Sequence, residues 1–355
     1  MESVVRQDIS DIISENPELI DQFIDRATLV TGATGMIGRY AVCLLAESIR
    51  ERNGSGKVIA NVRNRAKGEK VFAEYLSDDS FSLLVSDVND VTEIEGSLDY
   101  IVHSASPTQP NDFLEHPVDI IKTNVFATDT LLRIAKDKSA RFCLLSTLEV
   151  YGAVHSPTYP AYVAEEDFGS LDSLHLRSAY PESKRLAEAL CVAYKKQFSV
   201  DSTIVRLAPT ISPVIDPADE RVFAQFINTI VKKEDITIFA DAADKQRSYT
   251  YIADAITGIF TAMARSTDEM FVFNLANNDN VASIKELAEA VISVAGEGTA
   301  KLNIAQREVN QNTSASTGLL LLDSKRLLDT GWVPRYSLEK SMEQAVRHVS
   351  SLDKS

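Results

Sequence analysis

The chain has 355 residues, of which 45% are hydrophobic, and a formal net charge of −15 at pH 7. This length and composition suit one large or two closely joined α/β domains, and the charge makes nucleic acid and anionic membrane surfaces poor partners. The sequence has no apolar run of about 18 residues, so we expect no membrane-spanning helix. The first residues do not have the pattern of a signal peptide. Cys43, Cys143 and Cys191 lack the spacing of metal ligands, which indicates a cytoplasmic protein with reduced, buried thiols.

The N-terminal part of the chain predicts a helical extension followed by a dinucleotide-binding turn. Residues 1–26 form the extension, which we interpret as a packing segment interrupted near Pro17. An apolar strand over 27–31 then runs into Gly32, Gly35 and Gly38. These glycines permit a tight turn, close approach of a phosphate, and packing of the following helix against the strand. The positive N-terminal end of that helix, 36–50, would face a pyrophosphate.

Strands and helices alternate along the next part of the chain. Further strands are predicted near 57–62, 81–85, 99–103, 141–146 and 202–207, and the longer helices over 117–137 and 181–198. Such alternation predicts an α/β fold, a Rossmann-type doubly wound parallel sheet covered on both faces. We assign 27–207 to this dinucleotide-binding domain, with 230–262 returning to it. Residues 208–355 would form a smaller C-terminal substrate-binding α/β region.

Residues after the second and third strands would contact the adenosine half of the cofactor. The acid expected for NAD is missing after the second strand, where Arg63 stands instead. Arg63, helped by Arg65, would meet a 2′-phosphate and favour NADP; the alternative is that both are solvated loop arginines. Asp87 and Val88 would hold the adenine, and Ala105 and Ser106 follow the fourth strand beside the cofactor.

The chemistry is predicted at Tyr180 and Lys184. Positions i and i+4 share one face of a helix, so both side chains can point into one site. A neighbouring ammonium favours the phenolate of a tyrosine whose ordinary pKa is about 10, which makes Tyr180 a usable base. Thr147, at the end of the strand 141–146, would hydrogen-bond the reacting oxygen. A second Tyr-x-x-x-Lys, Tyr336–Lys340, lies near the C-terminus, and we interpret it as a surface coincidence.

Several motifs in order resemble one protein family. The chain, from about residue 27 to 347, resembles an extended short-chain dehydrogenase/reductase of the nucleotide-sugar epimerase/dehydratase family. The matching stretches are 31–38, 122–125, 146–152, 180–184, 221–223, 246–254 and 331–334. The resemblance implies NAD, with NADP as the alternative, and a nucleotide-diphosphate sugar as substrate. The cofactor-binding residues it implies, with those above, are Gly32, Thr34, Gly35, Met36, Ile37, Gly38, Arg63, Asp87, Val88, Ala105, Ser106, Asn124, Tyr180 and Lys184.

The residues after Thr147 bear on the reaction. In the 4,6-dehydratases of this family the residues at this strand end resemble Thr-Asp-Glu. This chain has Thr147-Leu148-Glu149 at the same place. Leucine cannot donate a proton, which disfavours dehydration, and the UDP-glucuronate decarboxylases, with Thr-Ser-Glu, are most similar. The resemblance therefore implies Thr147, Glu149, Tyr180 and Lys184 as catalytic residues. For Glu149 the alternative is a carboxylate that faces solvent.

One motif departs from the family. The pattern Arg-x-x-Asn-x-Tyr-Gly-Pro appears here as 206–213, with Pro209 in place of the amide that usually helps hold the substrate. The remaining substrate-binding candidates are Ser106, Thr147, Arg221 and Arg247, of which the two arginines would pair with a diphosphate. The alternative for either arginine is a surface or interdomain salt bridge.

Three functions stay open at this stage. They are a decarboxylase, a 4-epimerase or 4,6-dehydratase, and a non-catalytic nucleotide-binding regulatory protein. The resemblance also implies a homodimer that pairs through helices 117–137 and 181–198, both of which carry more apolar residues than one buried face needs. The alternative is that the N-terminal extension folds over that face and keeps the protein monomeric.

Overall fold

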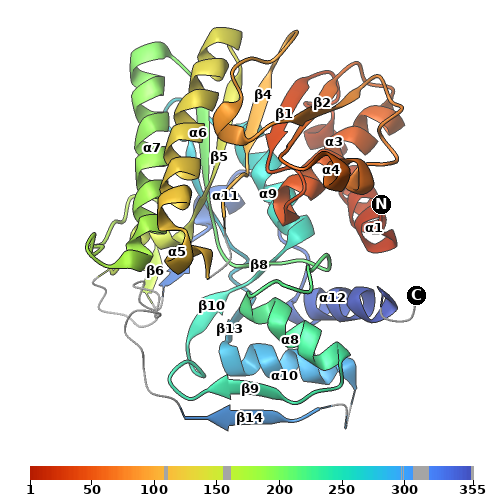
Figure 1. Cartoon of the computed structure of the whole chain (residues 1–355), viewed down its shortest axis with the longest axis vertical. Coiled ribbons are helices and arrows are strands. Elements are labelled where there is room, and N and C mark those ends of the chain that lie inside the picture. The colour runs from red at the N-terminus through yellow and green to blue at the C-terminus, as the bar shows by residue number, and fades with distance from the viewer. Residues whose placement is uncertain (108–110, 155–160, 297, 299, 307–319, 353–355) are drawn as a thin grey trace.

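A seven-stranded parallel sheet forms the centre of the larger lobe (Figure 1). The structure is a computed structural model that describes residues 1–107, 111–154, 161–296, 298, 300–306 and 320–352. The strand order is β12-β7-β5-β4-β1-β2-β3. Their bounds are Ala27–Thr31 (β1), Lys57–Val62 (β2), Phe81–Val85 (β3), Tyr100–His103 (β4), Arg141–Thr147 (β5), Ser202–Leu207 (β7) and Val272–Leu275 (β12). The predicted fold class, a doubly wound Rossmann-type sheet, is confirmed.

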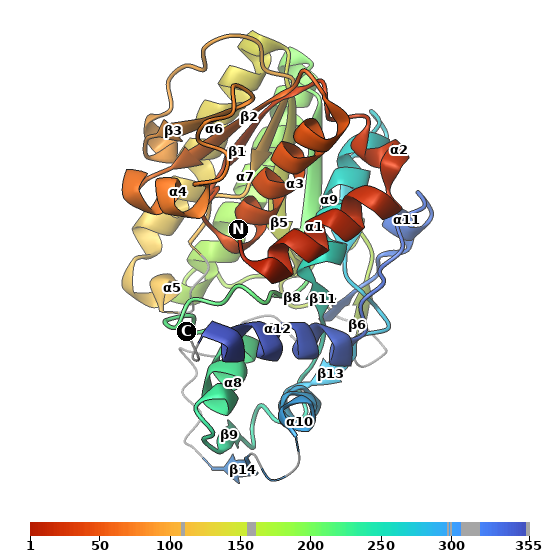
Figure 2. The same cartoon turned by 90° about the vertical axis from the view of Figure 1, so that its right-hand side faces the viewer.

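Helices cover both faces of this sheet, as Figures 1 and 2 show. α6 (Pro117–Lys138) and α7 (Ala179–Phe198) pack together on one face, and α3 (Met36–Arg52) and α9 (Ile252–Arg265) pack together on the other. α3, α6 and α7 end alike, at Asn53, Ser139 and Ser199, whose φ angles of 51°, 54° and 59° are left-handed. Such a residue turns the chain out of the helix and lets its N–H reach the last carbonyls.

The segment predicted to return to the sheet, 230–262, is divided in the structure. Its first part contains β9 (Ile236–Phe239), which pairs with β14 (Leu302–Ala305) away from the large sheet. Its last part belongs to α9, which packs against the sheet, and β12 then adds the edge strand beside β7. Within the predicted segment, the part that packs on the large sheet is therefore the beginning of α9.

The smaller lobe is built from helices and two-stranded sheets (Figure 1). Its main helices are α8 (Val222–Val231), α10 (Ile284–Ala295) and α12 (Leu338–Leu352). The remaining paired strands are β8 (Thr210–Ile211) with β11 (Thr250–Tyr251), β10 (Gln246–Ser248) with β13 (Val281–Ser283), and β6 (Ala161–Val163) with β15 (Leu320–Leu322). The short helices are α2 (Pro17–Ile20), α4 (Arg65–Val71), α5 (Asp112–Glu115), α11 (Lys325–Leu328), and the 3-10 turns η1 (Val88–Asp90), η2 (Leu148–Tyr151) and η3 (Leu176–Ser178).

The N-terminal extension places a carboxyl group, that of Asp8, in the interior of the protein. α1 (Ser3–Glu15) packs against α3 and α9, and the Asp8 carboxylate accepts hydrogen bonds from the hydroxyls of Tyr40 at 2.8 Å and Tyr251 at 2.9 Å. Tyr336 adds a longer contact of 3.5 Å and stacks on Tyr251 with ring centroids 4.3 Å apart. The expectation that Tyr336 lies on the surface is therefore wrong, since its ring is buried in the seam that α1 shares with the smaller lobe.

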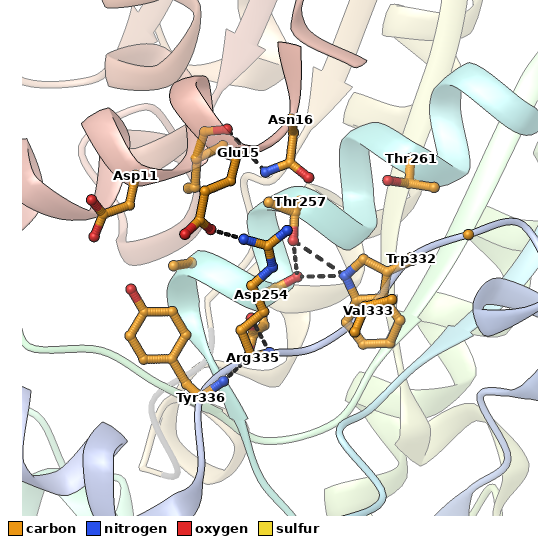
Figure 3. Close-up of a pocket in the computed structure, with 13 residues that line it drawn as sticks. Asp11, Glu15, Asn16, Asp254, Thr257, Thr261, Trp332, Val333, Arg335 and Tyr336 are labelled. Carbon is orange, nitrogen blue, oxygen red and sulfur yellow. Dashed lines mark hydrogen bonds and ion pairs between the residues drawn. The ribbon is translucent and has the colours of Figure 1, made fainter. Parts of the chain in front are cut away.

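A small cavity lies beside this cluster, where α1 meets α9 and the segment before α12 (Figure 3). The buried Asp254 carboxylate accepts the backbone N–H groups of Arg335 and Tyr336, at 2.9 and 3.0 Å. Arg335 forms an ion pair with Glu15 of α1. Because α1 lies on this side of the sheet, it does not cover α6 and α7, so the monomer-keeping role considered for the extension is contradicted.

Two observations bear on membranes and metals. No helix among the described residues is long and apolar enough to cross a membrane. Nor do the residues that the structure places include a cluster of three histidine, cysteine or carboxylate side chains able to hold a metal ion. Cys43, Cys143 and Cys191 are free and buried, as expected of packing residues.

Asp8 makes the stability of the fold depend on pH. Burial raises the pKa of Asp8 to about 6, and the tyrosine hydrogen bonds only partly oppose this. The pKa of the unfolded group is about 3.9. A raised pKa means that the folded state holds the proton more tightly, so this stabilisation is full below about pH 4 and is lost as the pH rises to 6. We expect Asp8→Asn to reduce the loss of unfolding free energy between pH 4 and 7 by about 2 kcal/mol.

Urea unfolding at pH 4, 5, 6 and 7 measures this difference. The matched control is Glu18→Gln, which removes an exposed carboxylate of the same extension and should leave the pH dependence unchanged. An Asp8→Asn variant with the wild-type pH dependence would contradict the assignment.

Candidate active site

The candidate site begins at the point where the strand order reverses, between β1 and β4. The chain leaves β1 at Gly32, which has a φ of +62°. A Cβ built on Gly32 would lie 2.8 Å from the Cα of Ala105, just after β4. The two strand ends therefore meet at a distance that only glycine permits, and in open parallel sheets such a crevice is where ligands bind.

The start of α3 suits an anionic group. A Cβ on Gly38 would lie 2.4 Å from the Gly32 carbonyl oxygen, so the helix packs on the turn only because Gly38 lacks a side chain. Gly35 provides no side-chain cap. The first-turn amides of Met36, Ile37 and Gly38 thus remain for a ligand, at the positive end of a 17-residue helix. This geometry fits a dinucleotide pyrophosphate, and the half-buried Thr34 lies in the same turn.

The residues expected at the adenosine end follow β2 and β3. Arg63 is exposed directly after β2, and Arg65 forms an ion pair with Glu69 at 3.4 Å. Asp87 accepts hydrogen bonds from the backbone and side chain of Asn89, both at 2.9 Å, and Val88 is buried beside it. These contacts hold Asp87 in a fixed orientation at the same edge of the sheet as the glycine turn.

A hydrogen-bond chain joins the β4 end to α6 and α7. The Ser106 hydroxyl donates to the Asn124 side-chain oxygen at 2.8 Å, and the Asn124 amide donates to the Ser183 hydroxyl at 2.9 Å. Asn124 is 1% exposed. These hydrogen bonds fix the register of α7, the helix that begins one residue before Tyr180.

Tyr180, Thr147 and Lys184 come together at the carboxyl end of β5. The Tyr180 ring is buried against Phe113, with centroids 4.7 Å apart, and the Thr147 side chain is among the groups that lower the pKa of its phenol. The Lys184 ammonium donates to the Leu145 carbonyl at 2.9 Å. The structure therefore gathers these three predicted residues at one site.

The charges that act on Tyr180 in the structure differ from those that the sequence predicts. Burial lowers the pKa of Lys184 to about 8, and Lys184 in turn helps burial lower the pKa of His103 to about 3. Burial, and then the Glu149 charge, raise the pKa of Tyr180 above its usual value. The cation that lowers the pKa of the phenol in this structure is Arg177, not Lys184 as the sequence suggested.

Arg177 was not identified from the sequence. Its Nη2 donates to Glu149 Oε1 at 2.9 Å, so Glu149 is paired rather than facing solvent alone. Glu149 is the second residue of η2, and its N–H donates to the Thr147 hydroxyl at 3.2 Å. The one signal in the sequence was spacing: Arg177 precedes Tyr180 by three residues, close enough to share a turn with it.

The two candidate substrate arginines come from the smaller lobe. Arg221 pairs with Asp219, and its Nη1 lies 3.2 Å from the Met36 sulfur in the cofactor turn. Arg247 lies on β10 and donates to the Gln246 carbonyl at 2.8 Å. Arg221 therefore borders the glycine turn, whereas Arg247 is held by its own strand.

The departure at Pro209 changes a side chain but not the path of the chain. The Pro209 carbonyl accepts the Thr250 N–H at 3.0 Å, and β8 continues from it to pair with β11. Just before it, Arg206 pairs with Glu188 of α7 at 2.7 Å. The backbone thus keeps its place, while the amide expected there is missing.

Comparison with known sequences identifies the family. A family model described as the NAD dependent epimerase/dehydratase family matches residues 28–276. The chain is 31% identical over 321 residues to UDP-glucuronic acid decarboxylase 1 of Arabidopsis thaliana, covering 90% of this chain and 68% of that protein. It is 28% identical to UDP-glucuronic acid decarboxylase 1 of Xenopus tropicalis, covering 90% and 71%.

Solved structures support the same fold. The epimerase Mth375 of Methanothermobacter thermautotrophicus has a TM-score of 0.79 at 18% identity and covers 97% of both chains. The UDP-glucuronic acid 4-epimerase of Bacillus cereus, solved with UDP-glucuronic acid and NAD, has a TM-score of 0.73 at 21% identity, covering 92% of this chain and 99% of that one. With the family model matching most of its length, the chain belongs to the NAD dependent epimerase/dehydratase family.

Proposed function

We propose that the chain oxidises a nucleotide-diphosphate sugar transiently at C4 and that the reaction is the decarboxylation of a UDP-linked uronic acid. The observation that carries this proposal is the meeting of Thr147, Glu149 and Tyr180 beside the glycine turn that suits NAD. The relatives named UDP-glucuronic acid decarboxylase support the choice of substrate.

Each residue has a separate role in this proposal. Tyr180 accepts the proton of the C4 hydroxyl, and Thr147 holds that oxygen by hydrogen bonding. Lys184, on the same face of α7, would hold the cofactor ribose. When bound, the nicotinamide would take a hydride from C4 and return it, so that the cofactor is recycled. Arg63, Asp87, Asn124 and Ser106 would line the path from the adenosine to the sugar.

Decarboxylation suits the residues after Thr147. The Leu148 side chain is buried in a small apolar cluster with Val150 and Tyr151, so it offers no proton to a departing hydroxyl. A C4 ketone makes a uronic acid a β-keto acid, which loses its carboxylate readily. Tyr180 and Thr147 form and hold that ketone, and the enolate left when carbon dioxide departs takes a proton at C5 from solvent before the hydride returns to C4. Arg221, beside Met36, would contact the diphosphate of the substrate, and Arg247 would add a second guanidinium.

The exposed face of α6 and α7 supports a homodimer. Apolar side chains that point away from the monomer core lie along both helices, and α1 is on the other side of the sheet. They are Val118, Ile121, Phe126, Leu186, Val192 and Phe198. A second copy of the chain, presenting the same two helices, would bury this face. The three free, buried thiols support a reducing compartment, so we also propose a cytoplasmic location.

The proposed function predicts one product from a panel of nucleotide sugars. UDP-glucuronate should lose the mass of carbon dioxide, measured by mass spectrometry, while UDP-glucose and dTDP-glucose stay unchanged. Tyr180→Phe should lower this rate by roughly 10²–10⁴-fold, because it removes the base and leaves the ring packed on Phe113.

The matched control is Tyr336→Phe, which removes the phenol oxygen of the other Tyr-x-x-x-Lys and should keep near-wild-type turnover. Wild-type turnover by Tyr180→Phe would contradict the assignment of the base. A product of unchanged mass would show an epimerase instead, and loss of water a dehydratase.

The homodimer predicts a sedimenting mass twice the 39.0 kDa of the chain at micromolar concentration. The double variant Ile121→Glu/Leu186→Glu should sediment as a monomer, because it places charges in the apolar contact. Val333→Glu, which changes an exposed apolar residue elsewhere, should stay dimeric. A wild-type protein that sediments at 39.0 kDa would refute the dimer.

A further inference from the structure

Arg177 occupies a place in the candidate site that no catalytic motif assigns to it. It lies in η3 and its side chain is only 12% exposed. Nη2 donates to Glu149 Oε1 at 2.9 Å, and the Glu149 side chain is 20% exposed. The pair thus joins η2, which follows β5, to the turn that leads into α7. Both ends of this ion pair are within three residues of a proposed catalytic group, Thr147 or Tyr180.

The ring of Phe113 lies between Arg177 and the proposed base. The Arg177 guanidinium carbon lies 4.1 Å from the centroid of the Phe113 ring, a cation–π distance. The same ring lies 4.7 Å from the Tyr180 ring, at an interplanar angle of 31°. Phe113 is therefore in contact with the cation and with the phenol, and its orientation depends on both.

The buried guanidinium of Arg177 is not explained by a contribution to stability alone. Arg177 Nη1 is buried and has no hydrogen-bond partner among the described residues. A buried donor left unpaired costs free energy, and a partly buried ion pair seldom repays its desolvation better than apolar packing would. A side chain that served only to fill this space would be apolar. The guanidinium therefore points to a role in the chemistry of the site.

We propose that Arg177 is a positioning residue for the proposed reaction: it holds the Glu149 carboxylate beside Tyr180 and, through Phe113, sets the plane of the phenol ring. This inference rests on the proposed function, since it assigns Tyr180 as the base. Glu149 and Arg177 act oppositely on the phenol, the first raising and the second lowering its pKa. Loss of Arg177 alone would leave the Glu149 charge uncompensated.

The other groups around Tyr180 do not replace this cation. On α7 itself, Lys184 donates to the Leu145 carbonyl, and its own pKa is lowered. From β4, His103 is neutral near pH 7 because burial holds its pKa at about 3. β5 contributes the neutral Thr147 and α6 the neutral Asn124. Of the groups that act on the phenol in this structure, Arg177 is the one with a positive charge.

The test compares Arg177→Met, Arg177→Lys and the double variant Arg177→Met/Glu149→Gln. The protein is produced with 3-fluorotyrosine, whose ring fluorine lowers the phenol pKa into a measurable range, and is saturated with NAD. The 19F signal of Tyr180, assigned by its loss in Tyr180→Phe, is titrated with pH. The pH dependence of turnover on UDP-glucuronate is measured in parallel on the unfluorinated proteins, and thermal unfolding checks that each variant folds.

We expect Arg177→Met to raise the pKa of Tyr180 by about one unit and to move the acidic limb of the rate profile upward equally, since the base must lose its proton. Arg177→Lys, which keeps the charge, should leave the pKa of Tyr180 near its wild-type value. The double variant should return this pKa toward the wild-type value. An unchanged Tyr180 titration in folded Arg177→Met, or an equal shift in Arg177→Lys, would overturn the proposal. The 19F titration needs no turnover, so an inactive wild type would refute the proposed function and leave this test readable.

Discussion

The close approach of Gly32 to Ala105 is the constraint on which the site depends. With only 2.8 Å available to a Cβ at Gly32, β1 and β4 end side by side and α3 starts directly beneath the crevice. β5 pairs with β4, so its last residue, Thr147, lies at the same edge of the sheet as this crevice. Any larger residue at Gly32 would separate the strand ends, and the cofactor turn and the proposed catalytic hydroxyls would no longer share one edge.

α7 connects this edge of the sheet to the proposed chemistry. One face of the helix carries four side chains that make contacts outside it. Tyr180 packs against Phe113, and Ser183 accepts a hydrogen bond from Asn124. Lys184 donates to the Leu145 carbonyl, and Glu188 pairs with Arg206. Each contact is made to a different element, so the helix cannot rotate without losing several of them. Such a rigid support is what a proton-transferring side chain needs.

The parts of the fold and the site that depend on local sequence patterns were predictable. The parts that depend on contacts between distant residues were not. Six of the seven strands of the sheet, the glycine turn and the spacing of Tyr180 and Lys184 depend on neighbouring residues, and the structure brings them together as expected. The edge strand β12 was not predicted. The Asp8 cluster joins residues up to 328 positions apart, so the buried place of Tyr336 had no local signal. Arg177 was missed because its importance lies in Glu149 and Phe113, on other elements.

The central claim is that a hydride leaves C4 and returns to the same sugar. The most direct measurement uses UDP-glucuronate with deuterium at C4, no added cofactor, and mass and NMR analysis of the product. The account predicts a decarboxylated product that retains deuterium at C4. Loss of that deuterium to solvent, its appearance at another carbon, or a stoichiometric demand for added NAD would contradict it.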